Sequence, residues 1–152
     1  MKKVFLLLVA VVTLGFAANA QNAIGIRGGF GSSTSAELSY MQGLGGNRLE
    51  LDLGLNFLND GDNPFHLAGI YQWTGNITGN LGWYAGIGAV VKYCPNHGLG
   101  LAVAGQIGLE YDLKSIPFQI TADFRPAWDF LSDANCGAGF GWGGALGIRY
   151  TF

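Results

Sequence analysis

Apolar and polar residues alternate along most of the chain after residue 20. The clearest stretch is RLELDLGLNFL at residues 48–58, where four leucines and a phenylalanine take one set of positions and Arg48, Glu50 and Asp52 take the other. Successive side chains of a β-strand point to opposite faces, so this stretch predicts a strand with one apolar and one polar face.

Turn-forming residues divide the rest of the chain into eight such segments. Gly-, Ser-, Asn- and Asp-rich stretches separate them, and short stretches of this kind join antiparallel strands as hairpins. Most segments are near the roughly 10 residues that a tilted membrane strand needs. The pattern predicts an all-β protein, an eight-stranded antiparallel up-and-down transmembrane β-barrel, with strands at Ala23–Gly31, Ala36–Gln42, Asn47–Leu58, Pro64–Asn76, Asn80–Tyr93, Gly98–Asp112, Ile116–Phe130 and Gly137–Phe152.

Glycine on the polar face decides which face meets lipid. A water-facing strand surface has no reason to collect glycine, which has low β propensity. The interior of a small closed barrel does, because long polar side chains from some strands need space beside them. The alternation places Gly54 of residues 48–58 on the polar face, and further glycines of the other segments lie there too, namely Gly25, Gly29, Gly82, Gly86, Gly88, Gly100, Gly108, Gly141, Gly143 and Gly147. We therefore expect the leucines of residues 48–58 to face lipid and Glu50 and Asp52 to face the lumen.

Aromatic residues on the apolar face gather toward the strand ends, with aliphatic residues between them. Two aromatic girdles around an aliphatic band are typical of a barrel that spans a bilayer. With a periplasmic N-terminus, one belt contains Tyr40, Tyr71, Trp73, Trp83, Tyr111, Phe118, Tyr150 and Phe152, and the other contains Phe30, Phe57, Phe65, Tyr93, Trp128, Phe130, Phe140 and Trp142.

Composition agrees with a membrane protein that lacks a membrane helix. Charged residues make up 12% of the chain and its mean hydropathy is +0.28, whereas a soluble domain carries about 25% charged residues. After residue 20 no apolar run approaches the roughly 20 residues of a spanning helix. The charge balance is mildly acidic, with no basic patch that would indicate a nucleic-acid partner.

The first 20 residues predict a cleaved signal peptide. A basic start, Met1-Lys2-Lys3, precedes an apolar run over residues 4–16, and Ala18-Asn19-Ala20 has the small-x-small form of a cleavage site. The apolar run is too short for a spanning helix. We expect residues 1–20 to be removed and residues 21–152 to form one exported barrel domain.

The last strand carries a resemblance to a known family. The ending GALGIRYTF has Phe152 as its last residue, aromatic Tyr150 two positions earlier and Gly147 further in. It resembles the C-terminal strand signature of bacterial outer-membrane proteins, although Ala145 stands where that signature usually has a polar residue. The whole predicted barrel is similar to the small eight-stranded OmpA/OmpX-like outer-membrane β-barrel family. The ANA-QN cleavage region resembles that of Bacteroidetes exports.

The resemblance implies location, partners and function. It implies an integral barrel in the outer membrane of a Gram-negative bacterium, in contact with outer-membrane lipid and lipopolysaccharide. In that family, Gly147, Tyr150 and Phe152 would form the signal read by the barrel-assembly machinery during insertion. We expect a monomer without a cofactor or metal, with a structural or surface role. A lipid A-modifying enzyme and a narrow pore remain the alternatives.

Charged residues on the polar face are the candidate site in the lumen. An eight-stranded barrel is just wide enough for its own side chains to fill, and charges buried there are costly unless they pair. The polar face predicts that arginines meet carboxylates in a network that plugs the lumen, formed by Arg27, Glu50, Asp52, Glu110, Asp123, Arg125 and Arg149.

Histidine and cysteine supply the other candidates. His66 and His97 could act with nearby Ser32, Ser33, Ser35, Ser132 or Glu37, but no motif fixes a nucleophile beside a base, as triad chemistry requires. We therefore expect no enzyme activity. Cys94 and Cys136 are the two cysteines of an exported chain, and both fall at the same predicted rim. We expect a disulfide between them, with two separate thiols as the alternative.

Overall fold

A computed structural model describes residues 21–32, 34–57, 64–94, 98–131 and 139–152. The predicted signal peptide at residues 1–20 lies outside these described residues. Within them, no helix is long and apolar enough to cross a membrane. The eight strands are β1 Ala23–Gly31, β2 Thr34–Leu44, β3 Asn47–Phe57, β4 Phe65–Thr78, β5 Leu81–Cys94, β6 Gly98–Asp112, β7 Phe118–Leu131 and β8 Gly139–Thr151.

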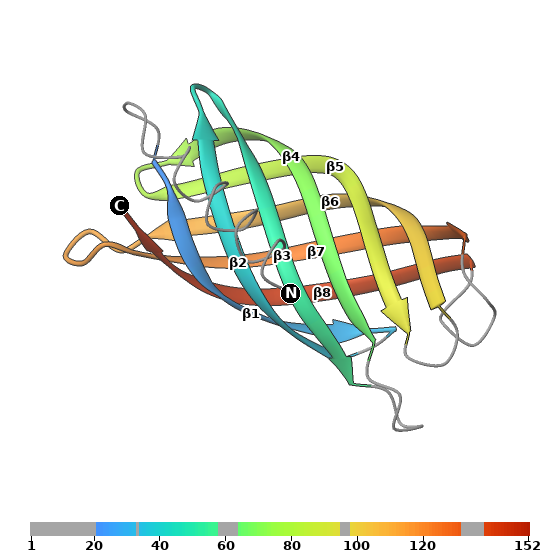
Figure 1. The fold of residues 1–152 in the computed structure, drawn as a ribbon. Coiled ribbons are helices and arrows are strands. Elements are labelled where there is room, and N and C mark those ends of the chain that lie inside the picture. Colours follow the sequence, from blue (N-terminus) through green and yellow to red (C-terminus); the bar gives the residue numbers. More distant parts are fainter. Residues whose placement is uncertain (1–20, 33, 58–63, 95–97, 132–138) are drawn as a thin grey trace.

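The strands form a closed antiparallel barrel in chain order (Figure 1). Each strand pairs with the next, and β8 returns to pair with β1 over the whole length of β1, from Ala23↔Thr151 to Gly31↔Gly143. Closure leaves no unpaired sheet edge, which a bilayer could not satisfy. The predicted fold, an eight-stranded up-and-down barrel, is confirmed.

Strand boundaries follow the turn chemistry closely. β1 and β6 have the bounds that the alternation predicts, and β3 begins at Asn47 as predicted and reaches Phe57, the last described residue before residue 64. β7 begins at Phe118 rather than Ile116, because Phe118 closes the turn itself: its amide donates to the Ile116 carbonyl, and its carbonyl accepts from the Leu113 amide at 2.9 Å. Pro117 has no amide hydrogen to donate to a strand ladder.

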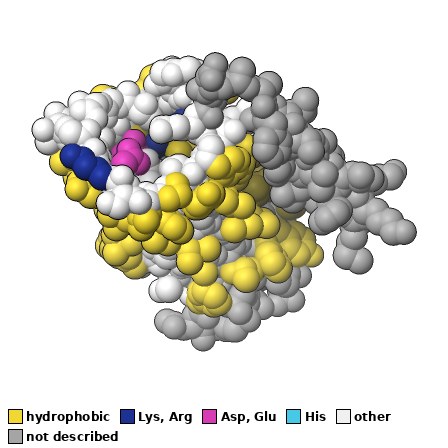
Figure 2. Space-filling model, turned by 90° about the vertical axis from the view of Figure 1, so that its left-hand side faces the viewer, with side chains coloured by type: hydrophobic (Ala, Val, Ile, Leu, Met, Phe, Trp, Pro, Cys, Tyr) yellow, Lys and Arg dark blue, Asp and Glu magenta, His cyan; other side chains and the backbone are white. Residues whose placement is uncertain are grey.

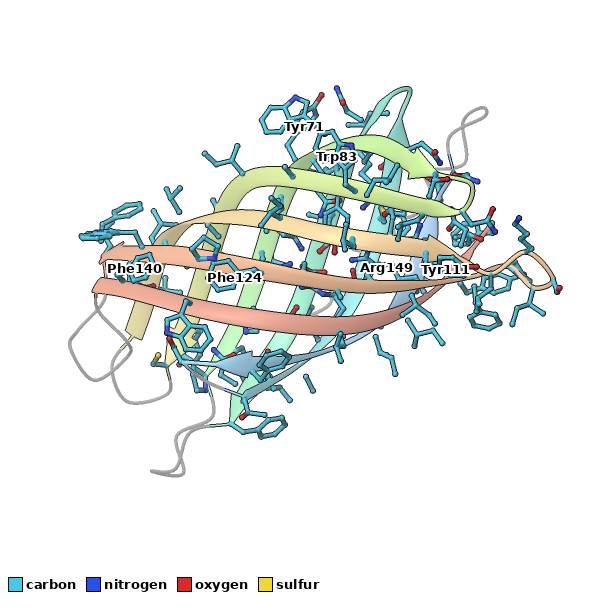
Figure 3. All side chains as sticks on the ribbon, turned by 180° about the vertical axis from the view of Figure 1, so that it is seen from behind. Tyr71, Trp83, Tyr111, Phe124, Phe140 and Arg149 are labelled. Carbon is cyan, nitrogen blue, oxygen red and sulfur yellow. The ribbon has the colours of Figure 1, made fainter. Side chains whose placement is uncertain are left out.

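The apolar face of the strands is the outside of the barrel. Leu53 is 46% exposed, whereas Glu50 and Asp52 are completely buried. Figure 3 shows Tyr71, Trp83 and Phe140 outside the wall. In the space-filling view, hydrophobic side chains cover much of the outer wall, and a few acidic and basic side chains are visible on the side that faces the viewer (Figure 2). The expected orientation is thus the observed one.

Aromatic side chains lie toward the two ends of the barrel. At the end with the chain termini, Phe118 and Tyr150 are register partners and pack edge to face with ring centroids 5.6 Å apart. At the opposite end Trp128 and Phe140 are register partners, with centroids 6.3 Å apart. The two groups correspond to the interfacial belts expected for a spanning barrel.

Candidate functional site in the barrel lumen

The centre of the lumen is occupied by buried ion pairs around Arg27 of β1. One guanidinium nitrogen, Nη1, lies 2.7 Å from Glu50 Oε1 and 2.7 Å from Asp52 Oδ2, both on β3. The other, Nη2, lies 2.7 Å from Asp123 Oδ1 on β7. Arg27 is only 3% exposed, so a single side chain joins three strands across the interior.

Two further arginines converge on the same carboxylates. Arg125 Nη2 lies 2.5 Å from Asp52 Oδ2 and 3.0 Å from Glu50 Oε1. Arg149 Nη2 reaches the other oxygen of Glu50 at 2.5 Å, and Arg149 is completely buried. Glu50 therefore receives three guanidinium groups, and these charge-assisted contacts are the strong class of hydrogen bond. We name the six residues Arg27, Glu50, Asp52, Asp123, Arg125 and Arg149 the central cluster.

Neutral polar side chains complete the central cluster. The Gln72 amide donates to Glu50 at 2.8 Å and to Gln106 at 2.6 Å, and Gln106 donates to Glu50 at 3.2 Å. The Tyr84 hydroxyl donates to Asp123 at 2.8 Å. All three side chains are at most 4% exposed. A buried carboxylate is stable when such donors satisfy its lone pairs.

A second pair lies toward the end that contains the chain termini. Arg48 Nη1 is 2.6 Å from Glu110 Oε2, and the guanidinium lies over the Tyr84 ring, 4.7 Å from its centroid. The sequence predicts that Glu110 pairs with Arg27, Arg125 or Arg149, but in the structure Glu110 pairs with Arg48. This end also holds a polar cavity of about 290 Å³ lined by Arg48, Glu110 and neighbouring turn residues.

The opposite end of the lumen holds a different set of charges. Lys92 of β5 pairs with Asp129 of β7 at 2.8 Å. Glu37 of β2 accepts a hydrogen bond from the Ser35 hydroxyl at 3.1 Å and lies 3.3 Å from His66 Nε2. These groups line a cavity of about 130 Å³, together with Arg27 and Arg125. We name this space the outer cavity.

Inward glycines provide the space for the long side chains. A Cβ added at Gly147 would lie 2.8 Å from Arg27 Cγ, and one added at Gly25 would lie 2.7 Å from Arg149 Cγ. At Gly108 it would lie 2.7 Å from Asp123 Cβ. Real Cβ atoms do not approach this closely in packed interiors. The inward glycines therefore leave the space that the long arginine side chains fill.

Arg48 and Tyr84 contact charged groups of the lumen but are not part of the network that the sequence predicts. The alternation places Arg48 on the polar face, and Tyr84 is assigned to neither face. Tyr84 lies two positions from Gly82 and from Gly86, which were both assigned inward. Period-two counting from either glycine would have placed the Tyr84 ring inside the barrel.

The candidate catalytic residues that the structure describes, Ser32, Ser35, Glu37 and His66, do not form a nucleophile–base pair. The Ser35 hydroxyl and His66 Nε2 both face the same oxygen of Glu37, so the carboxylate lies between the serine and the histidine. Ser32 accepts a hydrogen bond from the Trp142 amide at 3.0 Å. His97, Ser33 and Ser132 lie outside the described residues. Among the residues that are described, no group of three or more His, Cys, Asp or Glu side chains could hold a metal ion.

The remaining candidate residues lie at the strand ends. Cys94 is buried at the end of β5, and Cys136 lies outside the described residues, so the disulfide stays a prediction. Tyr150 and Phe152 face outward and are 45% and 51% exposed. The Phe152 amide donates to the Asn22 carbonyl at 2.9 Å, which ties the two chain ends of the barrel together.

Comparisons with known proteins identify the fold. No sequence-family model and no curated protein matches the chain. Among solved structures, the N-terminal β-barrel domain of Pseudomonas aeruginosa OprF matches with a TM-score of 0.68 at 15% identity, over 88% of this chain and all of that one. Neisserial surface protein A (NspA) matches with a TM-score of 0.65 at 11% identity, over 88% of this chain and 96% of that one.

A designed protein shares the same architecture. A de novo transmembrane β-barrel matches with a TM-score of 0.53 at 14% identity, covering 87% of this chain and 95% of the designed one. At these identities the likeness concerns the fold alone. The chain has the small transmembrane β-barrel fold of these solved structures.

Proposed function

We propose that this chain is a non-enzymatic integral protein of the outer membrane, with a structural or surface role and a lumen plugged by paired charges. The central cluster is the observation that carries the proposal. Three arginines and three carboxylates from β1, β3, β7 and β8 meet in the middle of the lumen, with most contacts between 2.5 and 3.0 Å. Because these side chains join opposite walls, they stabilise the barrel and obstruct the path along its axis.

The outer surface supports the membrane location. Its exposed side chains are mostly aliphatic at mid-height and mostly aromatic toward the ends. Those 40% exposed or more include Ile26, Leu38, Leu53, Leu67, Trp83, Ile107, Leu109, Phe124, Trp128, Leu146 and Phe152. Water would disfavour so much exposed apolar surface, whereas lipid would not. We expect export by the signal peptide, insertion by the barrel-assembly machinery, and a monomer surrounded by lipid and lipopolysaccharide.

Two measurements test the location and the absence of catalysis. The full chain should appear in the outer-membrane fraction after expression in a Gram-negative host and should resist extraction with alkaline carbonate. Mass spectrometry of lipid A from cells with and without the protein should give the same species. Recovery of the folded chain in the soluble periplasmic fraction would contradict the location, and a new lipid A species would support the enzyme alternative.

A narrow pore is the second candidate function, because two polar cavities occupy the two ends of the lumen. They measure about 290 Å³ and about 130 Å³. The central cluster lies between them, and Arg27 and Arg125 line the outer cavity. The plug and the pore predict opposite conductances for the unaltered protein in a planar bilayer.

A further inference from the structure

A missing side chain on β3 lets residues of β2 and β4 meet. Glu37, Gly54 and His66 are register partners in one row across β2, β3 and β4. A Cβ at Gly54 would lie 2.7 Å from Glu37 Cγ and would also overlap the His66 ring. Because Gly54 has no Cβ, the imidazole of His66 can lie over β3, and its Nε2 atom is 3.3 Å from Glu37 Oε1.

The charges of the lumen do not balance without His66. Among the described residues, leaving out Asp112, which is exposed at the rim of the lumen, the inward-facing arginines and lysine are one fewer than the inward-facing carboxylates. An uncompensated buried charge is strongly unfavourable in a low-dielectric interior. The cations are Arg27, Arg48, Lys92, Arg125 and Arg149, and the anions are Glu37, Glu50, Asp52, Glu110, Asp123 and Asp129.

The distances locate this deficit at Glu37. Each of the other five carboxylates, Glu50, Asp52, Glu110, Asp123 and Asp129, has a cation nitrogen within 2.8 Å. Glu37 has only longer approaches, 3.4 Å from Arg27 and 3.6 Å from Arg125, because both arginines are engaged with Glu50 and Asp52. The imidazole of His66, at 3.3 Å, is as close to Glu37 as any cation.

The surroundings of His66 allow it to carry a proton. It is 6% exposed, and its Nδ1 has no hydrogen-bond partner among the described residues. The charged groups around it are Glu37 from β2, its register partner Lys92 from β5, and Arg27, Arg125 and Asp129 across the outer cavity. Lys92 is held by Asp129 at 2.8 Å. The cavity of about 130 Å³ has room for about four waters.

We propose that His66 binds a proton and supplies the sixth positive charge of the lumen, in an ion pair with Glu37. The outer cavity is then a proton-binding site that joins β2 to β4 over Gly54. Histidine is the side chain that changes charge between about pH 5 and 8, so this contact responds to pH. The inference rests on the inward-facing charges alone and holds for a closed or a conducting barrel, so its failure is distinct from failure of the plug.

Reversible urea unfolding of the full barrel in phosphatidylcholine vesicles tests the proposal. A proton bound in the folded state stabilises at low pH, and this stabilisation is lost as pH rises through the titration of the folded histidine. For the unaltered protein and for the His97→Gln control, the folding equilibrium constant should fall by about tenfold or more between about pH 5.5 and 8.5. In His66→Gln and in Glu37→Gln this fall should be smaller than in the unaltered protein. The comparison uses the pH dependence within each variant, so a uniform loss of stability does not obscure it.

Nitrogen-15 NMR of the imidazoles in the same vesicles gives a second readout. At about pH 6 the His66 resonances should show both ring nitrogens carrying hydrogen, and the Glu37→Gln variant should show this form only at lower pH. A neutral His66 at pH 6, or a pH dependence that His66→Gln retains in full, would overturn the proposal. Selective recovery of stability at pH 8.5 by sodium or potassium over tetramethylammonium would assign the missing charge to a bound metal cation instead.

Discussion

At the residue scale, some inward positions accept only glycine, because any side chain there would overlap its neighbours. Gly54 separates Glu37 from His66, and a side chain there would overlap both. Gly28 lies on the outer face of β1, where an added Cβ would meet nothing within 4 Å. The alternation places Gly54 inward with Glu50 and Asp52, but it gives no indication of which side chains would crowd that position.

Gly54→Ala should destabilise the barrel, and Gly28→Ala should not. The added methyl group at residue 54 displaces the His66 ring or the Glu37 stem, and overpacking of this kind costs about 1–3 kcal/mol. Urea unfolding in detergent micelles or vesicles would measure both variants. Equal stabilities for the two would show that the space over Gly54 is not occupied as described.

Leu53→Arg tests which face meets lipid. Leu53 is 46% exposed near the middle of β3, where an arginine in the hydrocarbon region costs about 2–4 kcal/mol. The matched control is Leu44→Arg at the end of β2, for which about 0–1 kcal/mol is expected near the interface. Heat-modifiable gel migration would report the folded fraction of each. A fully folded Leu53→Arg variant in the membrane would mean that the faces are reversed.

Arg125→Ala tests the pairing inside the central cluster. It removes the contact of Arg125 with Asp52 at 2.5 Å, so the negative charge of Asp52 is compensated less completely. Breaking a buried ion pair in this way costs about 3–5 kcal/mol of folding stability. A double-mutant cycle with Asp52→Asn should show a coupling of about 0.5–3 kcal/mol. Strictly additive effects would exclude direct pairing.

At the scale of the strands, the sequence predicts the elements well and their lateral contacts poorly. Eight alternating segments gave eight strands, because alternation and turn residues are local signals. Whether Glu110 meets Arg48 or Arg27 depends on strand register and side-chain length, which a single chain does not reveal. Asp123 illustrates the same limit: it lies two residues from Arg125, yet its partners are Arg27 and Tyr84 from distant strands.

The last strand provides a prediction at this scale. Phe152→Ser keeps the backbone hydrogen bond to Asn22 but removes the terminal aromatic side chain of the assembly signal that the sequence resembles. We expect less protein in the outer membrane and more in the periplasm after fractionation. Phe140→Ser, on the outer face at the start of the same strand, is the control. Unaltered insertion of Phe152→Ser would remove this support for the resemblance.

The two cysteines provide a second prediction at the scale of the strands. A Cys94–Cys136 disulfide would link the end of β5 to the segment before β8. Closing a loop of about 40 residues stabilises by roughly 3–4 kcal/mol in the chain-entropy account. Alkylation of membrane-extracted protein without reductant, followed by mass spectrometry, should find neither cysteine modified. Two alkylated cysteines would rule the disulfide out.

At the scale of the whole molecule, one arrangement accounts for both surfaces. Glycine and arginine complement each other inside, aliphatic and aromatic residues divide the outside by height, and closure of β8 on β1 removes the sheet edges. The sequence was informative about this scale because both surfaces follow from one period-two pattern. It could not show that the charges divide into a central cluster and two end groups, since that division depends on which side chains meet across the lumen.

The measurement that tests the account most directly is the conductance of the purified barrel in a planar bilayer at neutral pH. With the central cluster in place, the unaltered protein should show no stable open level. The double variant Arg27→Ser/Arg125→Ser, which removes two of the long side chains that cross the lumen, should show a stable one, and the outward-facing control Leu53→Ala should behave like the unaltered protein. Stable conducting steps from the unaltered protein, unchanged in the double variant, would contradict the claim that paired charges close the lumen.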